Sequence, residues 1–360
     1  MRIAVLPGDD IGPEITAAAL TVLEKADQRF GLNLDFGVHE VGMESHRRNG
    51  TTLPDSALAA AMNADGVLLG PGGMTAYPPV SDGGINIPGT VRKRLDLYAN
   101  LRPARARLGL ERARPGLDCL IARENTEGFY ADRNMFLGSG EFMPTADCAL
   151  SVRKVTRQAS RRIAKRAFAL AEKRRGHVTI VGKRHVLQIT DGLFVEEAEA
   201  VAAKYPDVKF REVDIDAMVA DIYTNPDRFD VILVTNMFGD ILSNLAVALS
   251  GGLGLAAALN VGDERAAANA GHGSAPDIAG KGIANPSGLI LSAAMLLNWW
   301  GERSGKAQYG LAAAAIEHSL DDLLRSGTRT GDLGGQSGTR SFADAIAANL
   351  REPNHSSLSN

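Results

Sequence analysis

Short apolar runs alternate along this chain with longer stretches of helical periodicity. Buried strands are predicted at residues 3–6, 67–70, 177–181 and 231–234, and further strands near 34–40 and 208–213. Between them, residues 13–30 and 289–300 have helical spacing, and Pro13 suits the first turn of a helix. Strands that alternate with helices are typical of βαβ units and a largely parallel sheet. The pattern therefore predicts an α/β protein.

The run 231–234 ends at the Gly239-Asp240 pair, which predicts a turn followed by a helix through Leu249. Asp240 and Asn244 are four residues apart, so on a helix they share one face and could offer two oxygen atoms to one cation. The alternative is that Asp240 caps the helix and Asn244 is a surface residue. This stretch alone leaves both interpretations open.

Charged residues follow several of the other predicted strands. Lys183 comes just after the strand at 177–181, and Asp214 and Asp216 come after the strand at 208–213. A lysine in a dry cleft can act as a base, although most lysines at strand ends are exposed. The two aspartates could bind a metal ion, or they could cap the next helix.

Residues 90–114 are rich in arginine, and Arg102 precedes Pro103, which disfavours a helix at that position. Arg123 ends the apolar run 120–122. Guanidinium groups bind carboxylates in a bidentate manner, so Arg92, Arg102 and Arg123 together would suit a di- or tricarboxylic acid. Solvated surface arginines are the alternative.

Two further segments are candidates for binding anionic ligands. Residues 151–175 predict a strongly basic helix closed by Gly176, and nucleic-acid binding or a solvated face would both explain its charge. The net charge of −3 favours the solvated face. Residues 271–286 predict a glycine-rich loop that could approach a phosphate or an adenine, and a second such loop spans 331–339. The G-x-G-x-x-G fingerprint of dinucleotide-binding folds is missing from the first turn.

Length and cysteine content limit the class of protein further. A chain of 360 residues is long enough for two domains. Cys119 and Cys148 do not form a C-x-x-C motif, and Cys119 is predicted to be a buried thiol in a reducing compartment. No signal peptide and no apolar segment of about 20 residues is present, so we expect a cytoplasmic protein that does not bind membranes.

Four segments in order, at residues 97–103, 123–128, 236–240 and 272–286, resemble the β-decarboxylating dehydrogenases, which include the isopropylmalate, isocitrate, homoisocitrate and tartrate/D-malate enzymes. The resemblance covers nearly the whole chain. It implies a two-domain α/β fold like that of isopropylmalate dehydrogenase, with parallel or mixed sheets flanked by helices, and not a Rossmann fold. It also implies a cofactor domain at 1–97 plus 251–360, and a substrate, metal and dimerisation domain at 98–250 with an arm near 130–150.

The same resemblance assigns roles to residues of the candidate site. Arg92, Arg102 and Arg123 match the family's substrate-carboxylate ligands, and Tyr130 matches the tyrosine that protonates the enolate. Lys183 matches the lysine that helps to deprotonate the substrate hydroxyl. Asp216, Asp240 and Asn244 match the Mg²⁺ or Mn²⁺ ligands. Lys183 and Asp216 would reach the substrate from the other subunit of a homodimer.

The loop at 272–285 resembles the family's adenosine loop. The implied cofactor contacts are His272, Gly273, Ser274, Ala275, Asp277, Ile278 and Asn285. The Asp277-Ile278 pair looks like the NAD-type pattern, because a carboxylate accepts hydrogen bonds from ribose hydroxyls and repels a 2′-phosphate. We therefore expect NAD as the cofactor.

The chain departs from the family pattern at Asn244, His185, Asn269 and Asp10, where most relatives have aspartate, asparagine, glutamate and glycine. In this family the stretch that corresponds to residues 85–91 determines substrate choice, and here it matches neither the isopropylmalate nor the isocitrate pattern. Ile85 and Ile87 could line an apolar pocket, and Asn86 could meet a polar substituent.

We expect NAD-dependent oxidative decarboxylation of a 3-carboxy-2-hydroxy acid, with 3-isopropylmalate as the first candidate and tartrate/D-malate or isocitrate/homoisocitrate as alternatives. A weakly active or regulatory family member is a further alternative, motivated by the departures. Nucleic-acid binding by the basic helix is the most distant one.

Overall fold

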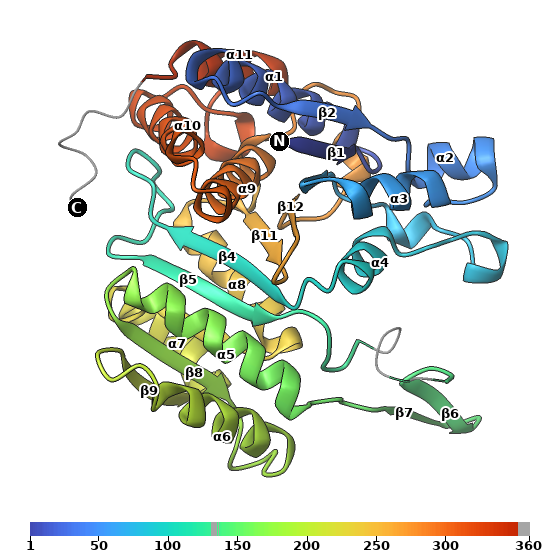
Figure 1. Cartoon of the computed structure of the whole chain (residues 1–360), viewed down its shortest axis with the longest axis vertical. Coiled ribbons are helices and arrows are strands. Elements are labelled where there is room, and N and C mark those ends of the chain that lie inside the picture. The colour runs from blue at the N-terminus through green and yellow to red at the C-terminus, as the bar shows by residue number, and fades with distance from the viewer. Residues whose placement is uncertain (131–134, 136, 352–360) are drawn as a thin grey trace. The chain divides into compact units, whose positions relative to one another are not determined.

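The computed structural model describes residues 1–130, 135 and 137–351, and these form two compact units. Unit 1 comprises Met1–Asp96, Arg107–Ala113 and the chain from Gly251, and unit 2 comprises Leu97–Ala106 and Arg114–Ser250. The α/β fold with mixed sheets, predicted above, is confirmed (Figure 1). No helix within the described ranges combines the length and the hydropathy that a membrane span requires.

Unit 1 is built on a sheet with the strand order β2-β1-β3-β12-β11. Its pairs are parallel except that of β11 with β12, which is antiparallel. The strands are β1 (Arg2–Leu6), β2 (Asp35–Val38), β3 (Gly66–Leu69), β11 (Ala257–Val261) and β12 (Ala266–Ala270). The helices are α1 (Gly12–Phe30), α2 (Gly42–Asn49), α3 (Asp55–Asn63), α4 (Ile87–Arg94), α9 (Ser287–Ser304), α10 (Ala307–Ser326) and α11 (Thr339–Ala348). The apolar α9 packs on β11 and β12, so the predicted core helix is confirmed.

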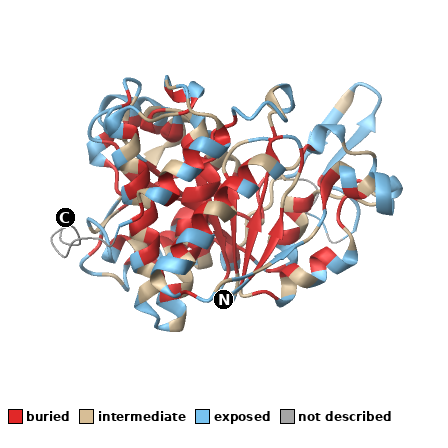
Figure 2. Cartoon of the chain, turned by 90° about the horizontal axis from the view of Figure 1, so that it is seen from above, coloured by how far each residue is buried: buried red, intermediate tan, exposed pale blue. Residues whose placement is uncertain are grey.

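Unit 2 contains the strand order β4-β5-β10-β8-β9, in which β4 and β5 are antiparallel and the other pairs are parallel. Its strands are β4 (Ala99–Arg105), β5 (Asp118–Glu124), β8 (His177–Gly182), β9 (Lys209–Asp214) and β10 (Val231–Val234). The helices α5 (Arg157–Glu172) and α6 (Thr190–Ala202) pack together on one face, and α7 (Ile215–Thr224) and α8 (Asn236–Ser250) contribute to the core on the other (Figure 1). The hairpin of β6 (Glu141–Thr145) and β7 (Cys148–Ser151) is exposed along most of its length (Figure 2).

Strand register in unit 2 brings the candidate catalytic residues to one edge. Arg123 near the end of β5 pairs with Val234 at the end of β10, and Val234 pairs with Val181 near the end of β8. Gly182 in turn pairs with Asp214 at the end of β9. The segments that follow these strands therefore all leave the sheet at its carboxyl edge, where open α/β sheets bind their ligands.

The predicted start of α8 was wrong. The helix begins at Asn236 and contains Gly239 and Asp240, so Asp240 does not cap it. Gly239 serves packing instead of a turn, because a Cβ there would lie 2.7 Å from Cγ of Arg123 and 2.9 Å from a methyl group of Val234. The missing side chain lets the helix lie directly against the arginine.

The basic helix also begins later than the sequence predicted, at Arg157 instead of Ser151. Thr156 caps it by accepting a hydrogen bond from the backbone N–H of Ala159 at 3.2 Å. Gly176, in the left-handed region, closes the turn beyond the helix. Arg157 and Arg161 are paired with Glu197 on α6, at 3.0 and 2.7 Å, which supports the solvated, ion-paired face over nucleic-acid binding.

Candidate active site

Two buried arginines share one carboxylate at the carboxyl edge of unit 2. Arg102 on β4 is 6% exposed and Arg123 on β5 is 2% exposed. Nη1 of Arg102 lies 3.1 Å from Oδ1 of Asp240, and Nη1 of Arg123 donates to the same oxygen atom. A guanidinium group this deeply buried needs a polar partner, and Asp240 supplies only one negative charge for two positive ones.

Neutral side chains complete the binding of both arginines. Nε of Arg123 donates to the amide oxygen of Asn236 at 2.9 Å, and Nε of Arg102 donates to the amide oxygen of Asn100 at 3.1 Å. Nη1 of Arg102 also donates to the hydroxyl of Ser243 at 2.8 Å. These acceptors fix the guanidinium planes without neutralising their charge. The sequence analysis did not single out these three residues, although Asn236 lies in one of the family segments.

The phenol of Tyr130 joins this cluster. Nη2 of Arg123 donates to the Tyr130 hydroxyl at 2.8 Å, and the hydroxyl donates to Oδ2 of Asp240 at 3.1 Å. The hydroxyl therefore already lies beside two of the predicted ligands, as a proton donor must. Four predicted site residues, Arg102, Arg123, Tyr130 and Asp240, are thus in mutual contact.

Burial and charge shift two pKa values in the cluster. Burial alone would raise the pKa of the Asp240 carboxyl, but Arg123 and Arg102 outweigh it, with the Tyr130 hydrogen bond, and hold that pKa below its usual value. Burial, together with repulsion from Arg123, lowers the pKa of Arg102 to about 10. Asp240 is therefore ionised and Arg102 is charged near neutral pH.

Lys183 and Asp216 form a separate ion pair in which Nζ of Lys183 donates to Oδ1 of Asp216. Asp214 lies 3.5 Å from the same Nζ atom and 3.0 Å from Nδ1 of His185. The hydrogen bond that Lys183 donates to Asp216 raises the pKa of Lys183 and lowers the pKa of Asp216. Asp214 occupies the N-cap position of α7 but makes no side-chain capping bond, so both carboxylates hold the lysine.

The predicted nucleotide segment lies in unit 1, where hydrogen bonds fix both of its ends. The carbonyl of Ser274 accepts from the backbone N–H of Ile11 at 3.1 Å. Asn285 donates to Asp332 at 3.0 Å and accepts from the backbone N–H of Ser287 at 2.9 Å. Burial lowers the pKa of His272, which favours the neutral imidazole.

The middle of the segment remains accessible. Asp277 lies in a short 3-10 helix, Pro276–Ile278, and is exposed together with Gly273, whereas Ala275 and Ile278 are half-buried. Ala275 itself adopts a left-handed conformation with φ of 44°. The carboxylate of Asp277 is therefore open to solvent, as a group that contacts a ribose would need to be.

Three further residues that the sequence singled out lie on α8 or in unit 1. Asn244 is exposed, one turn after Asp240 on α8, so the two oxygen donors do share a helix. Arg92 is half-buried on α4 of unit 1. The amide oxygen of Asn269 accepts from Asn260 and its amide nitrogen donates to the carbonyl of Ala270, so Asn269 stabilises its own sheet.

A hard divalent cation prefers about six to eight oxygen ligands. No group of three His, Cys, Asp or Glu side chains is placed for a metal ion among residues 1–130, 135 and 137–351. Asp240 and Asn244 offer the right donor atoms, a carboxylate and an amide oxygen, and both are accessible. The chemistry of these donors suits Mg²⁺ or Mn²⁺, with further ligands required from substrate, water or a second chain.

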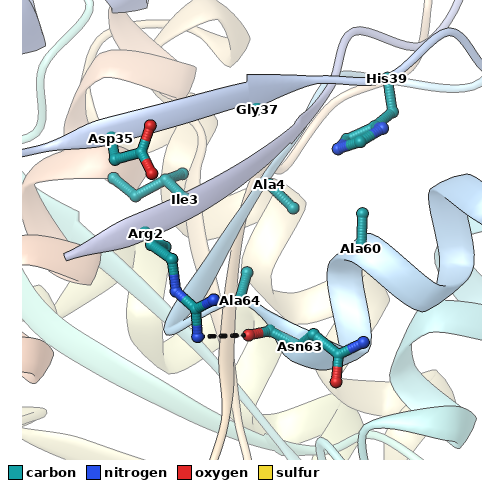
Figure 3. Close-up of a pocket in the computed structure, with 9 residues that line it drawn as sticks. All are labelled: Arg2, Ile3, Ala4, Asp35, Gly37, His39, Ala60, Asn63 and Ala64. Carbon is teal, nitrogen blue, oxygen red and sulfur yellow. Dashed lines mark hydrogen bonds between the residues drawn. The ribbon is translucent and has the colours of Figure 1, made fainter.

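A pocket of about 220 Å³ lies elsewhere in unit 1, between β1, β2 and α3 (Figure 3). Arg2 donates from Nη2 to the carbonyl of Asn63 at its rim, 3.1 Å away, and His39 lies on the far side. None of the predicted site residues lines it. The arginine cluster is therefore the better candidate for chemistry.

Comparison with known proteins identifies the family of this α/β chain. The model of the isocitrate/isopropylmalate dehydrogenases matches residues 2–346, so the chain belongs to that family.

Relatives are similar along almost their whole length. The 3-isopropylmalate dehydrogenase of Archaeoglobus fulgidus is 40% identical over 97% of this chain and 99% of its own. The isocitrate/homoisocitrate dehydrogenase of Thermus thermophilus is 41% identical over 97% of this chain and 98% of its own. The crystal structure of isocitrate dehydrogenase from Methylococcus capsulatus matches with a TM-score of 0.85 and 38% identity, over 98% of this chain and 99% of that one.

Proposed function

We propose that the chain catalyses the NAD⁺-dependent oxidative decarboxylation of a 3-carboxy-2-hydroxy acid, with 3-isopropylmalate as the first candidate. The observation that carries the proposal is the contact of Arg102, Arg123, Tyr130 and Asp240 in one buried cluster. Two guanidinium groups suit a malate-type dicarboxylate, and family membership supports the reaction class.

In the proposed mechanism, the arginines bind the two carboxylates, and we assign Arg92 to the same substrate. Lys183 accepts the hydroxyl proton while the hydride leaves C2, so that a 3-carboxy-2-oxo acid forms; for this step it must first lose the proton that its hydrogen bond to Asp216 favours. Its C3-carboxylate bond then breaks and releases CO₂. Tyr130 donates its hydroxyl proton to C3 of the resulting enolate, and its contact with Arg123 keeps this donor in place.

NAD⁺ would supply the hydride acceptor, held by residues 272–285, with Asp277 meeting the ribose hydroxyls. Mg²⁺ or Mn²⁺, held by Asp240 and Asn244 and by Asp216 of a second subunit, would polarise the substrate hydroxyl. Since a 2′-phosphate would lie against the Asp277 carboxylate, the chain should prefer NAD⁺ to NADP⁺.

The substrate preference follows from the stretch before Arg92. Asn86 caps α4, because its amide oxygen accepts from the backbone N–H of Gly89 at 2.9 Å, which leaves its amide nitrogen for a polar substituent. Ile87 is buried, whereas Ile85 and Asn86 are half-buried. Ile85 suits an apolar substituent on C3, which supports 3-isopropylmalate as the first candidate.

NADH formation tests the proposal directly. We expect turnover of 3-isopropylmalate with Mn²⁺, weaker turnover of D-malate, tartrate, isocitrate and homoisocitrate, and loss of activity with a chelator. Failure to oxidise any of these acids, with NAD⁺ still bound, would support the alternative of a regulatory family member.

The sharing of Lys183 between subunits has its own test. If Lys183 serves the second subunit of a homodimer, Lys183→Ala and Tyr130→Phe subunits should complement each other when mixed. Hybrid dimers would contain one intact site, so about a quarter of the wild-type rate should return. No recovery after verified subunit exchange would place both residues in one chain's site.

A further inference from the structure

A buried ion pair connects the start of α5 to the start of α6 in unit 2. Nη1 of Arg153 lies 2.6 Å from Oδ1 of Asp191, and the two side chains are 7% and 0% exposed. Burying an ion pair costs desolvation energy that its attraction often does not offset. Simple stabilisation is therefore a weak explanation for the pair.

The second oxygen of Asp191 holds the backbone of Lys183. Oδ2 accepts from the backbone N–H of Lys183 at 2.7 Å. Asp191 thus fixes the point where the lysine leaves β8, from which its side chain reaches Asp216.

Arg153 contacts two more segments of the candidate site. Its Nη2 donates at 3.1 Å to the hydroxyl of Thr235, the residue directly before α8, which is the helix that carries Asp240. Its guanidinium carbon lies 5.3 Å from the ring centre of Phe238 on α8 and 5.7 Å from that of Phe129, which precedes Tyr130. The guanidinium group of Arg153 therefore contacts the segments that carry Tyr130 and Asp240. Through Asp191 it is also connected to the segment that carries Lys183.

We propose that Arg153 and Asp191 are positioning residues: Asp191 sets the place from which Lys183 reaches the second subunit's site, and Arg153 ties that point to the segments that carry Tyr130 and Asp240 in the chain's own site. The inference rests on the proposed function. Neither residue is assigned a contact with the reacting atoms. Both act on the residues that make such contacts, through their backbone and their packing.

Two variants of Asp191 test the proposal. Asp191→Ala removes both contacts. Asp191→Asn keeps the shape, but its amide has one acceptor end and one donor end, so either the Lys183 N–H or Arg153 must face a second donor. Each variant should lower kcat about 10- to 100-fold, because a misplaced base loses its alignment with the substrate. KM for NAD⁺ should stay within about twofold, because the predicted nucleotide contacts lie in unit 1.

A readout independent of turnover follows Lys183 itself. Acylation of Lys183, quantified by mass spectrometry against the exposed Lys306, should become faster in both variants. Nζ of Lys183 is held by Asp216 and lies 3.5 Å from Asp214, so a lysine displaced from these two carboxylates presents a more accessible amine to the reagent. This measurement still works if none of the tested acids is a substrate, so failure of the proposed function and failure of this inference are distinguishable.

Glu197→Ala is the matched control. Glu197 is another buried carboxylate on α6, and it forms ion pairs with Arg157 and Arg161 on α5, neither of which belongs to the candidate site. It should lower stability while leaving kcat and Lys183 acylation near the wild-type values. If the Asp191 variants change neither quantity more than Glu197→Ala does, at an equal loss of stability, the pair is structural only and the inference is wrong.

Discussion

Nε of Arg123 donates to the amide oxygen of Asn236 at 2.9 Å, so an uncharged side chain orients a guanidinium group that is 2% exposed. Asn236→Asp keeps the acceptor but adds a negative charge beside the arginine. The substrate carboxylate would then bind to a guanidinium group whose positive charge is partly neutralised. We expect KM for the acid to rise about tenfold, equivalent to about 1.4 kcal/mol, in steady-state assays.

Asn100→Asp repeats the same change at Arg102, whose Nε donates to the Asn100 amide oxygen. Asn49→Asp introduces the same charge at an exposed position of helix α2 and serves as the control. If charge is the cause, both buried variants raise KM and the exposed one does not. An unchanged KM in the two buried variants would show that the arginines do not bind the substrate carboxylates.

The Asp240 carboxyl predicts an acid-dependent contribution to stability. Its pKa is lower in the folded chain than in the unfolded chain, because Arg123 and Arg102 outweigh the effect of burial. A group of this kind stabilises the fold above its unfolded pKa of about 3.9, and the contribution is lost as the pH falls through that value towards the folded pKa. The difference in free energy of unfolding between the wild type and Asp240→Asn should therefore shrink from pH 6 to pH 3.

Urea unfolding at several pH values measures this difference. Asp207→Asn, the same substitution at an exposed loop position, serves as the control. A difference that grows as the solution becomes more acidic would contradict the ion pairing of Asp240.

Asn244 provides a prediction for metal binding. Asn244→Asp places a carboxylate one turn after Asp240 on the same helix, so the affinity for Mn²⁺ should rise about tenfold in the presence of substrate. Without a cation, the two like charges should destabilise α8 slightly. Ala248→Asp adds the same charge one turn further along α8 at another exposed position. Equal gains from both variants in calorimetric titrations would indicate a general charge effect and not a ligand.

Glu14 on α1 predicts an indirect effect on NAD⁺. Its carboxylate accepts from the backbone N–H of Ala284 at 3.2 Å and from the hydroxyl of Thr339, so it ties the end of the nucleotide segment to two helices. Glu14→Ala should loosen that segment and raise the dissociation constant for NAD⁺ about threefold to tenfold, as measured by titration of NAD⁺. KM for the acid, bound chiefly through unit 2, should change much less. The opposite pattern would argue against a nucleotide site at 272–285.

Much of the fold could be predicted because β-branched runs such as 231–234 are buried on both faces, and burial requires apolar residues regardless of tertiary detail. Gly239 shows where this reasoning stops. Its sequence context predicts a turn, but the glycine is needed inside α8 for close contact with Arg123, a residue more than a hundred positions earlier. A local pattern cannot contain that information.

The candidate site divides in the same way. Arg102, Arg123, Tyr130 and Asp240 were identified because they match functional positions of a family that the sequence resembles. Ser243, Arg153, Asp191 and Asn100, the last of them inside a resembling segment, carry no chemistry alone, and their importance arises from contacts that only the folded chain makes. Asp10, which the resemblance predicts to replace a glycine, adopts a left-handed φ of 53°.

The shared use of Asp240 by two arginines has a practical consequence. Arg102 and Arg123 carry two positive charges and Asp240 carries one negative charge, so these three groups have a net charge of +1 before a substrate arrives. Buffer anions such as phosphate, sulfate and citrate have the geometry to compete for these guanidinium groups. Apparent substrate affinities should therefore depend on the buffer, and kinetic constants for this enzyme will be comparable only when the anions in the assay are the same.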